Sequence, residues 1–428
     1  MSILALSPSA PRVHNPRMPS AESSLATAIR RAVARREREI RDFTAALVSV
    51  PTENPPGRCY AQCARLIAAK LDSLRLPVHL VRAPANLPGG SPEPRVSVLS
   101  SLGSGRRTLY FHGHYDVVPA QSARQFRPVV ANGVLAGRGS ADMKSGIAAM
   151  IYSMAVLKNL RVPLDGKIGL VIVPDEETAG PGGSRYLARR GLLAKNGIGM
   201  FTAEPTSGVV WNACRGAISM RVTIRGKPVH VGLHFRGVNA FEQAMEVARA
   251  FSALQRRVAR RRTRFNISPA VAESSVLLIG GQAAGGANFN SVPAEFSFTL
   301  DRRFNPEESL AAEKRALFAV LDRFRRRGFK IETQILQEEP AAGVSPRSPA
   351  ARTLAACARE ITGLVPRFEM CPGLLETRFY AQCGVPAYAF GPGKLELAHG
   401  PNEAVAIKKV CEFTAIYALA AARILAPQ

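Results

Sequence analysis

The hydrophobic and polar positions of the chain follow helical and strand patterns in alternation. Apolar residues at helical spacing predict amphipathic helices, and short apolar runs predict buried strands. In the first half of the chain these patterns predict helices at Ser23–Val48, Ala61–Leu74 and Ser145–Asn159, and strands at Val96–Ser100, Thr108–His112 and Lys167–Val173. Alternating strands and helices are typical of a sheet covered by helices, and therefore of an α/β domain.

A different order of elements follows residue 213. The patterns predict a strand, a helix, two strands, a helix and a strand, at Ala217–Ile224, Ala240–Arg256, Ser275–Gly280, Ala294–Asp301, Pro306–Arg327 and Phe329–Leu336. This order is that of a ferredoxin-like α+β module. Because α/β character resumes at Ser348, we expect residues 214–337 to be inserted into a larger domain made of residues 23–213 and 338–428. Residues 1–22 are rich in Pro and Ser, and we expect them to form a flexible extension.

The chain carries a large excess of positive charge. Its 57 Lys and Arg residues against 32 Asp and Glu residues give a formal net charge of +25. Two basic runs, at residues 256–262 and 323–327, end predicted helices, where cations interact favourably with the helix dipole. Nucleic acid is one interpretation of such an excess, but no regular set of stacking aromatic residues accompanies the runs. We therefore expect an anionic substrate and no nucleic-acid partner.

Length, apolar content and cysteines narrow the class of protein. A chain of 428 residues that is 46% hydrophobic can form two or three domains with a large core. The seven cysteines include no Cys-x-x-Cys pair, which favours reduced thiols. No apolar run is long enough to span a membrane, and no basic region precedes the short apolar stretch after Met1. We expect a cytoplasmic protein without membrane contact.

Five short segments hold most of the chemically useful side chains. They are Gly113–Pro119, Gly137–Gly146, Pro174–Gly180, Ala203–Thr206 and Ala398–Glu403. Three of them follow apolar strands, at the sheet edge where ligands bind in open α/β sheets. Imidazole and carboxylate groups are good zinc ligands, and a nearby carboxylate can orient a ligating imidazole. Taken singly, each segment also has an ordinary interpretation, such as Asp142 capping a helix or residues 175–177 forming a solvated acidic turn.

Together and in this order, the five segments resemble the zinc-dependent family that includes bacterial glutamate carboxypeptidase, succinyl-diaminopimelate desuccinylase, acetylornithine deacetylase and aminoacylase. The resemblance covers nearly the whole chain from about Pro51. It implies a catalytic domain with a mixed sheet flanked by helices, and an inserted ferredoxin-like lid through which such proteins form homodimers. It also implies two Zn²⁺ per chain, with His114 and Glu204 on one ion, Glu177 and His399 on the other, and Asp142 bridging both.

The same resemblance assigns the remaining roles. Asp116 resembles the residue that orients His114, and Glu176 resembles the general base that activates a metal-bridging water. His230 resembles the lid histidine that stabilises the oxyanion, in dimeric relatives within the partner subunit's site. Three further residues resemble those that bind polar groups of the substrate in the family, namely Asn290, Arg303 and Arg378. Arginine suits a carboxylate because its planar fork binds both oxygens, although a solvated surface charge is the ordinary alternative.

The predicted function is hydrolysis of an amide or peptide bond near a carboxylate, in a small anionic N-acyl amino acid or peptide. The Gly-rich stretch Thr178–Ser184 favours the deacylase and desuccinylase branch. A dipeptidase or carboxypeptidase of the same family is the alternative, and a non-catalytic basic binding protein is the alternative of another class. Because the ligands are nitrogen and oxygen atoms only, Co²⁺ or Mn²⁺ also suits the predicted site.

Overall fold

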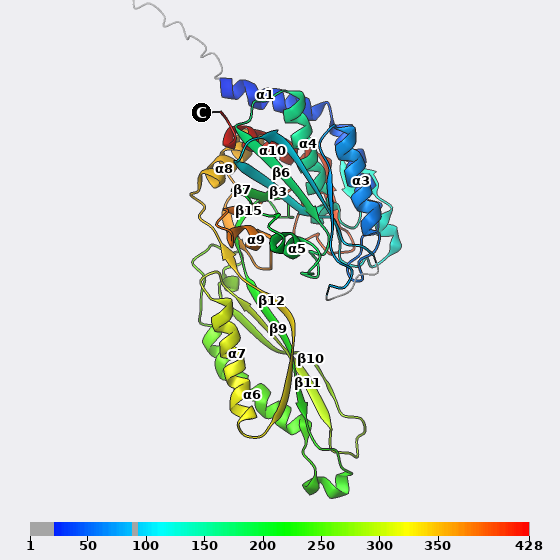
Figure 1. Cartoon of the computed structure of the whole chain (residues 1–428), viewed down its shortest axis with the longest axis vertical. Coiled ribbons are helices and arrows are strands. Elements are labelled where there is room, and N and C mark those ends of the chain that lie inside the picture. Colours follow the sequence, from blue (N-terminus) through cyan, green and yellow to red (C-terminus); the bar gives the residue numbers. More distant parts are fainter. Residues whose placement is uncertain (1–20, 88–92, 428) are drawn as a thin grey trace, which may run out of the picture.

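The computed structural model of the protein describes residues 21–87 and 93–427. The extension expected at residues 1–22 lies outside these residues, apart from its last two positions. Figure 1 shows a large α/β part and a smaller, elongated part that extends from one side of it. Within the described residues, no helix combines the length and the apolar character needed to cross a membrane.

A mixed sheet forms the centre of the large part, which confirms the α/β class. Its strands run in the order β1 (His79–Arg82), β2 (Val96–Ser104), β6 (Gly166–Val173), β3 (Thr108–His114), β7 (Gly197–Thr202), β15 (Ala387–Ala389), β8 (Val210–Cys214) and β13 (Ala342–Gly343), with β14 (Phe368–Cys371) also paired to β8. Strand β3 is parallel to β6 and β7, and every one of its residues is buried. The carboxyl ends of these three strands therefore meet at one edge of the sheet.

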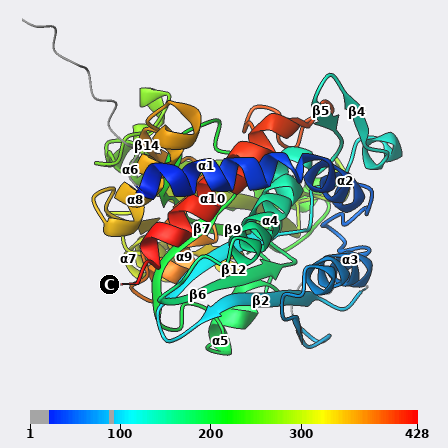
Figure 2. The ribbon, with the colours of Figure 1, turned by 90° about the horizontal axis from the view of Figure 1, so that it is seen from above.

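Helices cover one face of this sheet in two layers (Figure 2). The helices of this face are α1 (Ala21–Ala34), α2 (Glu37–Val48), α4 (Ser145–Asn159), α8 (Pro349–Thr362) and α10 (Ile407–Ile424), while α3 (Tyr60–Ser73) packs beside β2. On the opposite face lie α5 (Ser184–Arg189) and α9 (Thr377–Ala381). The apolar pattern predicted one helix over Ser23–Val48, but the chain turns at Arg35 and Arg36. The buried positions keep a helical spacing across this turn, so periodicity alone does not reveal it.

The small part has its own sheet and its own core. Its antiparallel strands run in the order β10 (Val276–Gly285), β11 (Glu295–Phe304), β9 (Gly216–Arg225) and β12 (Lys330–Glu339), with α6 (Ala240–Val258) and α7 (Leu310–Arg325) packed on one face. Along the chain the order is β9-α6-β10-β11-α7-β12, as the sequence pattern predicts. The chain enters this part after β8 and leaves it after β12.

Helix α4 connects the core to the sheet edge and is buried on every side. Gly146 in its first turn faces Ala203, and an added Cβ would lie 2.4 Å from the Ala203 Cβ. In an exposed helix, Gly→Ala stabilises by about 1 kcal/mol. Here we expect Gly146→Ala to destabilise the protein by about 1–3 kcal/mol through overpacking.

Urea unfolding measures this effect as a lower midpoint. Gly281→Ala is the matched control, because an added Cβ there has its nearest neighbours at ordinary contact distances of 3.5 Å. Equal midpoints for the two variants would contradict the expected clash.

Candidate metal centre

The chemically useful side chains gather at the carboxyl edge of β3, β6 and β7. His114 is the last residue of β3, Glu176 and Glu177 follow β6, and Glu204 follows β7. Asp142 enters from the short η2 segment (Ser140–Lys144), which leads directly into α4. His399 enters from the loop before strand β16 (Ala404–Ala406), which pairs with β5 (Val134–Ala136) and through it with β4 (Val129–Ala131).

Two groups of ligand-type atoms form there, each with its atoms within 4.8 Å of one another. In the first group His114 Nε2 lies 3.2 Å from Asp142 Oδ1 and 3.8 Å from Glu204 Oε2. In the second group His399 Nε2 lies 3.2 Å from Asp142 Oδ2 and 3.3 Å from Glu177 Oε2. Asp142 thus offers one oxygen to each group. The structure brings together the five residues that the sequence singled out, in the same two sets.

The helix-cap interpretation of Asp142 does not hold. The residue at the N-cap of α4 is Lys144, and no side chain caps that helix end. Burial alone would raise the pKa of Asp142, but hydrogen bonds from His114 and His399 hold it below its usual range. The carboxylate is therefore ionised and directed at the two imidazoles.

Negative charge is concentrated in this space, and a cation would offset it. Burial raises the pKa of Glu204, raises that of Glu177 to about 7, and raises that of Glu176 well above its usual range. Neighbouring carboxylates add to each of these shifts. Buried carboxylates are stable only when paired with cations or bound to metals. The imidazole and carboxylate donors here suit a divalent cation such as zinc.

Asp116 links the first histidine to the acidic loop. The Asp116 carboxylate is fully buried and accepts hydrogen bonds from the backbone N–H groups of Glu176 (3.2 Å) and Glu177 (3.1 Å). It also lies 3.5 Å from His114 Nδ1 and accepts a hydrogen bond from Asn54 Nδ2 at 2.8 Å. Sequence reasoning missed Asn54, because it lies in a Pro-rich segment that reads only as a loop.

Asp175 holds in place the turn that carries Glu176 and Glu177. This residue is 3% exposed and forms a buried ion pair with Arg95. It also accepts hydrogen bonds from the Tyr60 hydroxyl at 3.2 Å and from the Gly182 N–H at 3.2 Å. The solvated-turn interpretation of residues 175–177 is therefore wrong for Asp175. Its ion pair with Arg95, from a distant segment, left no local signal in the sequence.

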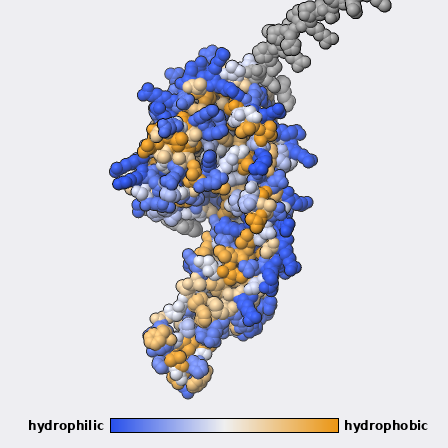
Figure 3. Space-filling view, turned by 180° about the vertical axis from the view of Figure 1, so that it is seen from behind, coloured by the Kyte–Doolittle hydropathy of each residue, from blue (hydrophilic) through white to orange (hydrophobic). Residues whose placement is uncertain are grey.

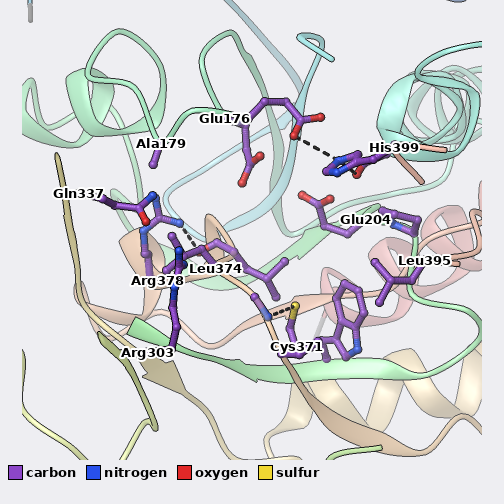
Figure 4. Close-up of a pocket in the computed structure, with 17 residues that line it drawn as sticks. Glu176, Ala179, Glu204, Arg303, Gln337, Cys371, Leu374, Arg378, Leu395 and His399 are labelled. Atoms are coloured by element: carbon purple, nitrogen blue, oxygen red, sulfur yellow. Dashed lines mark hydrogen bonds and ion pairs between the residues drawn. The ribbon is translucent and has the colours of Figure 1, made fainter. Parts of the chain in front are cut away.

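A cavity of about 410 Å³ opens beside the two ligand groups. Figure 4 shows Glu176, Glu204 and His399 on one side of it, and Gln337, Arg303 and Arg378 on the other. Apolar side chains also line the cavity, namely Trp211, Leu374, Leu375 and Leu395. The cavity is large enough for a small ligand with one polar and one apolar portion.

The two arginines of this cavity differ in their surroundings. Arg378 is 2% exposed, so the surface-charge interpretation is wrong for it. Its Nε donates to Glu339 Oε2 at 2.9 Å and its Nη1 donates to the Leu375 carbonyl at 2.7 Å. Glu339, at the end of β12, also binds Arg185. Arg303 is partly exposed and pairs with Asp301 through both carboxylate oxygens.

His230 and Asn290 do not reach this cavity within one chain. They lie next to each other in the small part, where the Val231 N–H donates to the Asn290 carbonyl at 2.9 Å. His230 is exposed and forms a single bridge with Ser291. Neither residue lines the cavity.

The fold and the two ligand groups define a metal-dependent hydrolase. Residues 110–423 match the model of peptidase family M20/M25/M40, and the chain belongs to this family of enzymes that cleave amide or peptide bonds. It is 26% identical over 408 residues to N-formyl-4-amino-5-aminomethyl-2-methylpyrimidine deformylase of Halalkalibacterium halodurans, covering 89% of this chain and 93% of the relative. It is 29% identical over 331 residues to succinyl-diaminopimelate desuccinylase of Nitrosomonas europaea, covering 74% and 84%.

Among solved structures, the chain is similar in fold to the dipeptidase Dug1p of Saccharomyces cerevisiae. The TM-score is 0.71 at 16% identity, over 94% of this chain and 99% of that one. At this identity the likeness concerns the fold, which includes both the large and the small part.

Metal binding is expected to release protons. Hydrogen bonds to Asp142 and Glu177 raise the pKa of His399 to about 10, and hydrogen bonds to three carboxylates raise that of His114 well above its usual range despite burial. Both rings are therefore protonated at pH 7 in the metal-free protein, whereas a metal ligand must be deprotonated. The apparent metal affinity should rise with pH, about tenfold per unit for each proton released.

Calorimetric titration of the chelator-treated protein, in two buffers of different ionisation enthalpy, counts the protons. His399→Gln should lower the count, whereas His79→Gln, at an exposed position on β1, should not. Equal apparent affinities at about pH 6 and pH 8 would contradict this linkage.

Proposed function

We propose that the protein is a two-zinc deacylase, which hydrolyses the amide bond of a small N-acyl amino acid. One observation carries this proposal: two ligand groups share Asp142 at one side of a cavity whose other side presents two arginines. The family defines the bond type, and the cavity supports the substrate class.

Each zinc ion has its own set of ligands in this proposal. His114 and Glu204 hold one ion, Glu177 and His399 hold the other, and Asp142 contributes one oxygen to each. When bound, two zinc ions polarise the scissile carbonyl and lower the pKa of a water molecule from roughly 15.7 toward about 7. The chain's own residues supply the geometry and the proton transfers.

Glu176 acts as the general base. It lines the cavity beside Glu177 but belongs to neither ligand group. Burial raises the pKa of its carboxyl, which suits a group that first takes a proton from the attacking water and then delivers it to the leaving nitrogen. Asp116 fixes its backbone N–H and thereby its position.

Arg303 and Arg378 bind the substrate carboxylate. Arg378 uses its Nε and Nη1 groups within the protein, and its Nη2 has no partner among the hydrogen bonds of the described residues. A carboxylate held there lies across the cavity from Glu176, so the substrate would span the space between the arginines and the base (Figure 4). The apolar side chains that line the cavity accommodate the remainder of the substrate.

The loop that follows Glu177 resembles the deacylase and desuccinylase branch of the family, and this resemblance favours a deacylase over a dipeptidase. The loop is rich in glycine, and Gly180, Gly182 and Gly183 pack against Asp175, Arg95 and Pro174 without room for a side chain. The two sequence relatives described above are a deformylase and a desuccinylase by name. A dipeptidase of the same fold is the second candidate, supported by the structural likeness alone.

We also infer a homodimer formed through the small part. Large apolar residues are exposed near its far end, among them Phe289 at 99% and Phe235 at 70% exposure. Figure 3 shows hydrophobic residues gathered on this part of the surface. A second copy that covers them would bring His230 and Asn290 toward the partner's cavity, where His230 would stabilise the oxyanion.

The cysteines favour a reducing compartment, and we propose a cytoplasmic location. All seven are free, and four of them are buried, away from oxidants. Disulfides are the rule in small secreted domains and rare in cytosolic proteins.

Replacement of the base should separate metal binding from turnover. We expect Glu176→Gln to retain two zinc ions per chain while kcat falls about 10²–10⁴-fold, because the proton transfer is lost. Glu412→Gln is the control, since among the described residues Glu412 pairs only with Lys409 on the same helix, α10. Metal analysis and steady-state kinetics on N-acyl amino acids and dipeptides, with zinc or cobalt added, measure both quantities. Undiminished turnover would remove Glu176 from this role.

Replacement of Arg303 should lower kcat/KM for substrates that carry a carboxylate. We expect Arg303→Gln to lower kcat/KM about 10–100-fold, the usual loss for a hydrogen bond to a charged group. The same variant should change little for substrates whose carboxylate is converted to a neutral amide. An equal loss of kcat/KM for both substrate types would show that Arg303 does not bind the carboxylate.

A further inference from the structure

The loop that carries His399 is exposed and strained. The His399 side chain is 52% exposed, and its backbone has a φ of +62°, in the left-handed region. A non-glycine residue in this region is strained and persists only where its surroundings fix it. The position of His399 relative to Asp142 therefore needs a cause outside the histidine itself.

A buried ion pair contacts the backbone of both His399 and Asp142. Arg138 and Glu403 are 1% and 2% exposed, and Arg138 Nη1 donates to Glu403 Oε2 at 2.6 Å. Arg138 Nη2 donates to the carbonyl of His399 at 3.0 Å. Glu403 Oε1 accepts from the backbone N–H groups of Ala141 at 2.9 Å and Asp142 at 3.0 Å. One continuous chain of hydrogen bonds thus runs from the backbone of Asp142 to the backbone of His399.

We propose that Arg138 and Glu403 are positioning residues that set the spacing of the Asp142–Glu177–His399 group, and with it the affinity for one of the two metal ions. This inference rests on the proposed zinc assignment. The planar fork of Arg138 suits the task, because it holds the Glu403 carboxylate and the His399 carbonyl at the same time. Groups that orient metal ligands typically change metal affinity 10–100-fold when they are replaced.

The other ligand group has a separate support. It shares Asp142, but its own ligand His114 is oriented by Asp116 at the end of the buried strand β3 and makes no hydrogen bond to Arg138 or Glu403 among those of the described residues. The two metals should therefore respond differently to the same substitution. That asymmetry distinguishes a positioning role from general destabilisation.

Arg138→Lys in the full chain tests the proposal, because a single ammonium cannot hold both partners in the fork geometry. Stepwise titration of the metal-free protein with Zn²⁺ or Co²⁺ should show one site weakened about 10–100-fold and the other within about threefold of its original affinity. Glu403→Gln should act in the same direction, since an amide has one oxygen and cannot accept both from Arg138 and from the N–H groups of Ala141 and Asp142. The control is Arg302→Lys, which alters a buried pair with Glu308 and Glu313 in the small part.

The outcomes are distinct. Two unchanged affinities in Arg138→Lys, with a stability loss equal to that of Arg302→Lys, would overturn the positioning role. Failure of the unsubstituted protein to bind two metals would instead overturn the proposed function. If Arg138→Lys does not fold, Glu403→Gln serves as the second variant, because it alters the same chain of hydrogen bonds from the other side. It should weaken the same site, and two unchanged affinities in this variant would refute the proposal.

Discussion

The shared carboxylate of Asp142 is the constraint on which the site depends. Its two oxygens lie 3.2 Å from imidazoles that come from opposite ends of the large part's sequence. For Asp142 to contact both imidazoles, the end of β3, the η2 segment and the loop before β16 must meet within a few ångströms. The close contact of Gly146 with Ala203 and the hydrogen bonds of Glu403 are two ways in which the core sets that meeting point.

The carboxylates of the candidate metal centre lie close together, and the positive charges of the protein around them do not fully neutralise them. The raised pKa values of Glu176, Glu177 and Glu204 express the free-energy cost of keeping these groups ionised in a buried place. Helix α4, buried from Ser145 to Leu157, and the sheet against which it packs provide the stability that offsets this cost. Residues that make the site reactive are thus separate from those that hold the fold.

The sequence predicted those features that have local signals. Strand ends followed by polar residues marked the segments of His114, Glu177 and Glu204, and the family resemblance assigned these residues as ligands. The order of elements predicted the inserted small part. The partners Asn54 and Arg95 were missed because buried contacts join segments far apart in the chain, and neither has a periodic pattern around it. Arg138 and Glu403 stood within the segments of interest, yet only the fold shows that they face each other.

Glu339 is the last residue of strand β12 and fixes this end of the strand to the large part. Its carboxylate, 1% exposed, is held by Arg378 and Arg185 of the large part, and a buried charge that loses its partners incurs a large desolvation cost. A short way along the same strand, the pairing with β9 is irregular between Ile335 and Gln337. Arg303 of β11 lines the same side of the cavity as Arg378, so the small part and the large part build this side together. A change in the position of the small part would therefore alter the side of the cavity that presents the arginines.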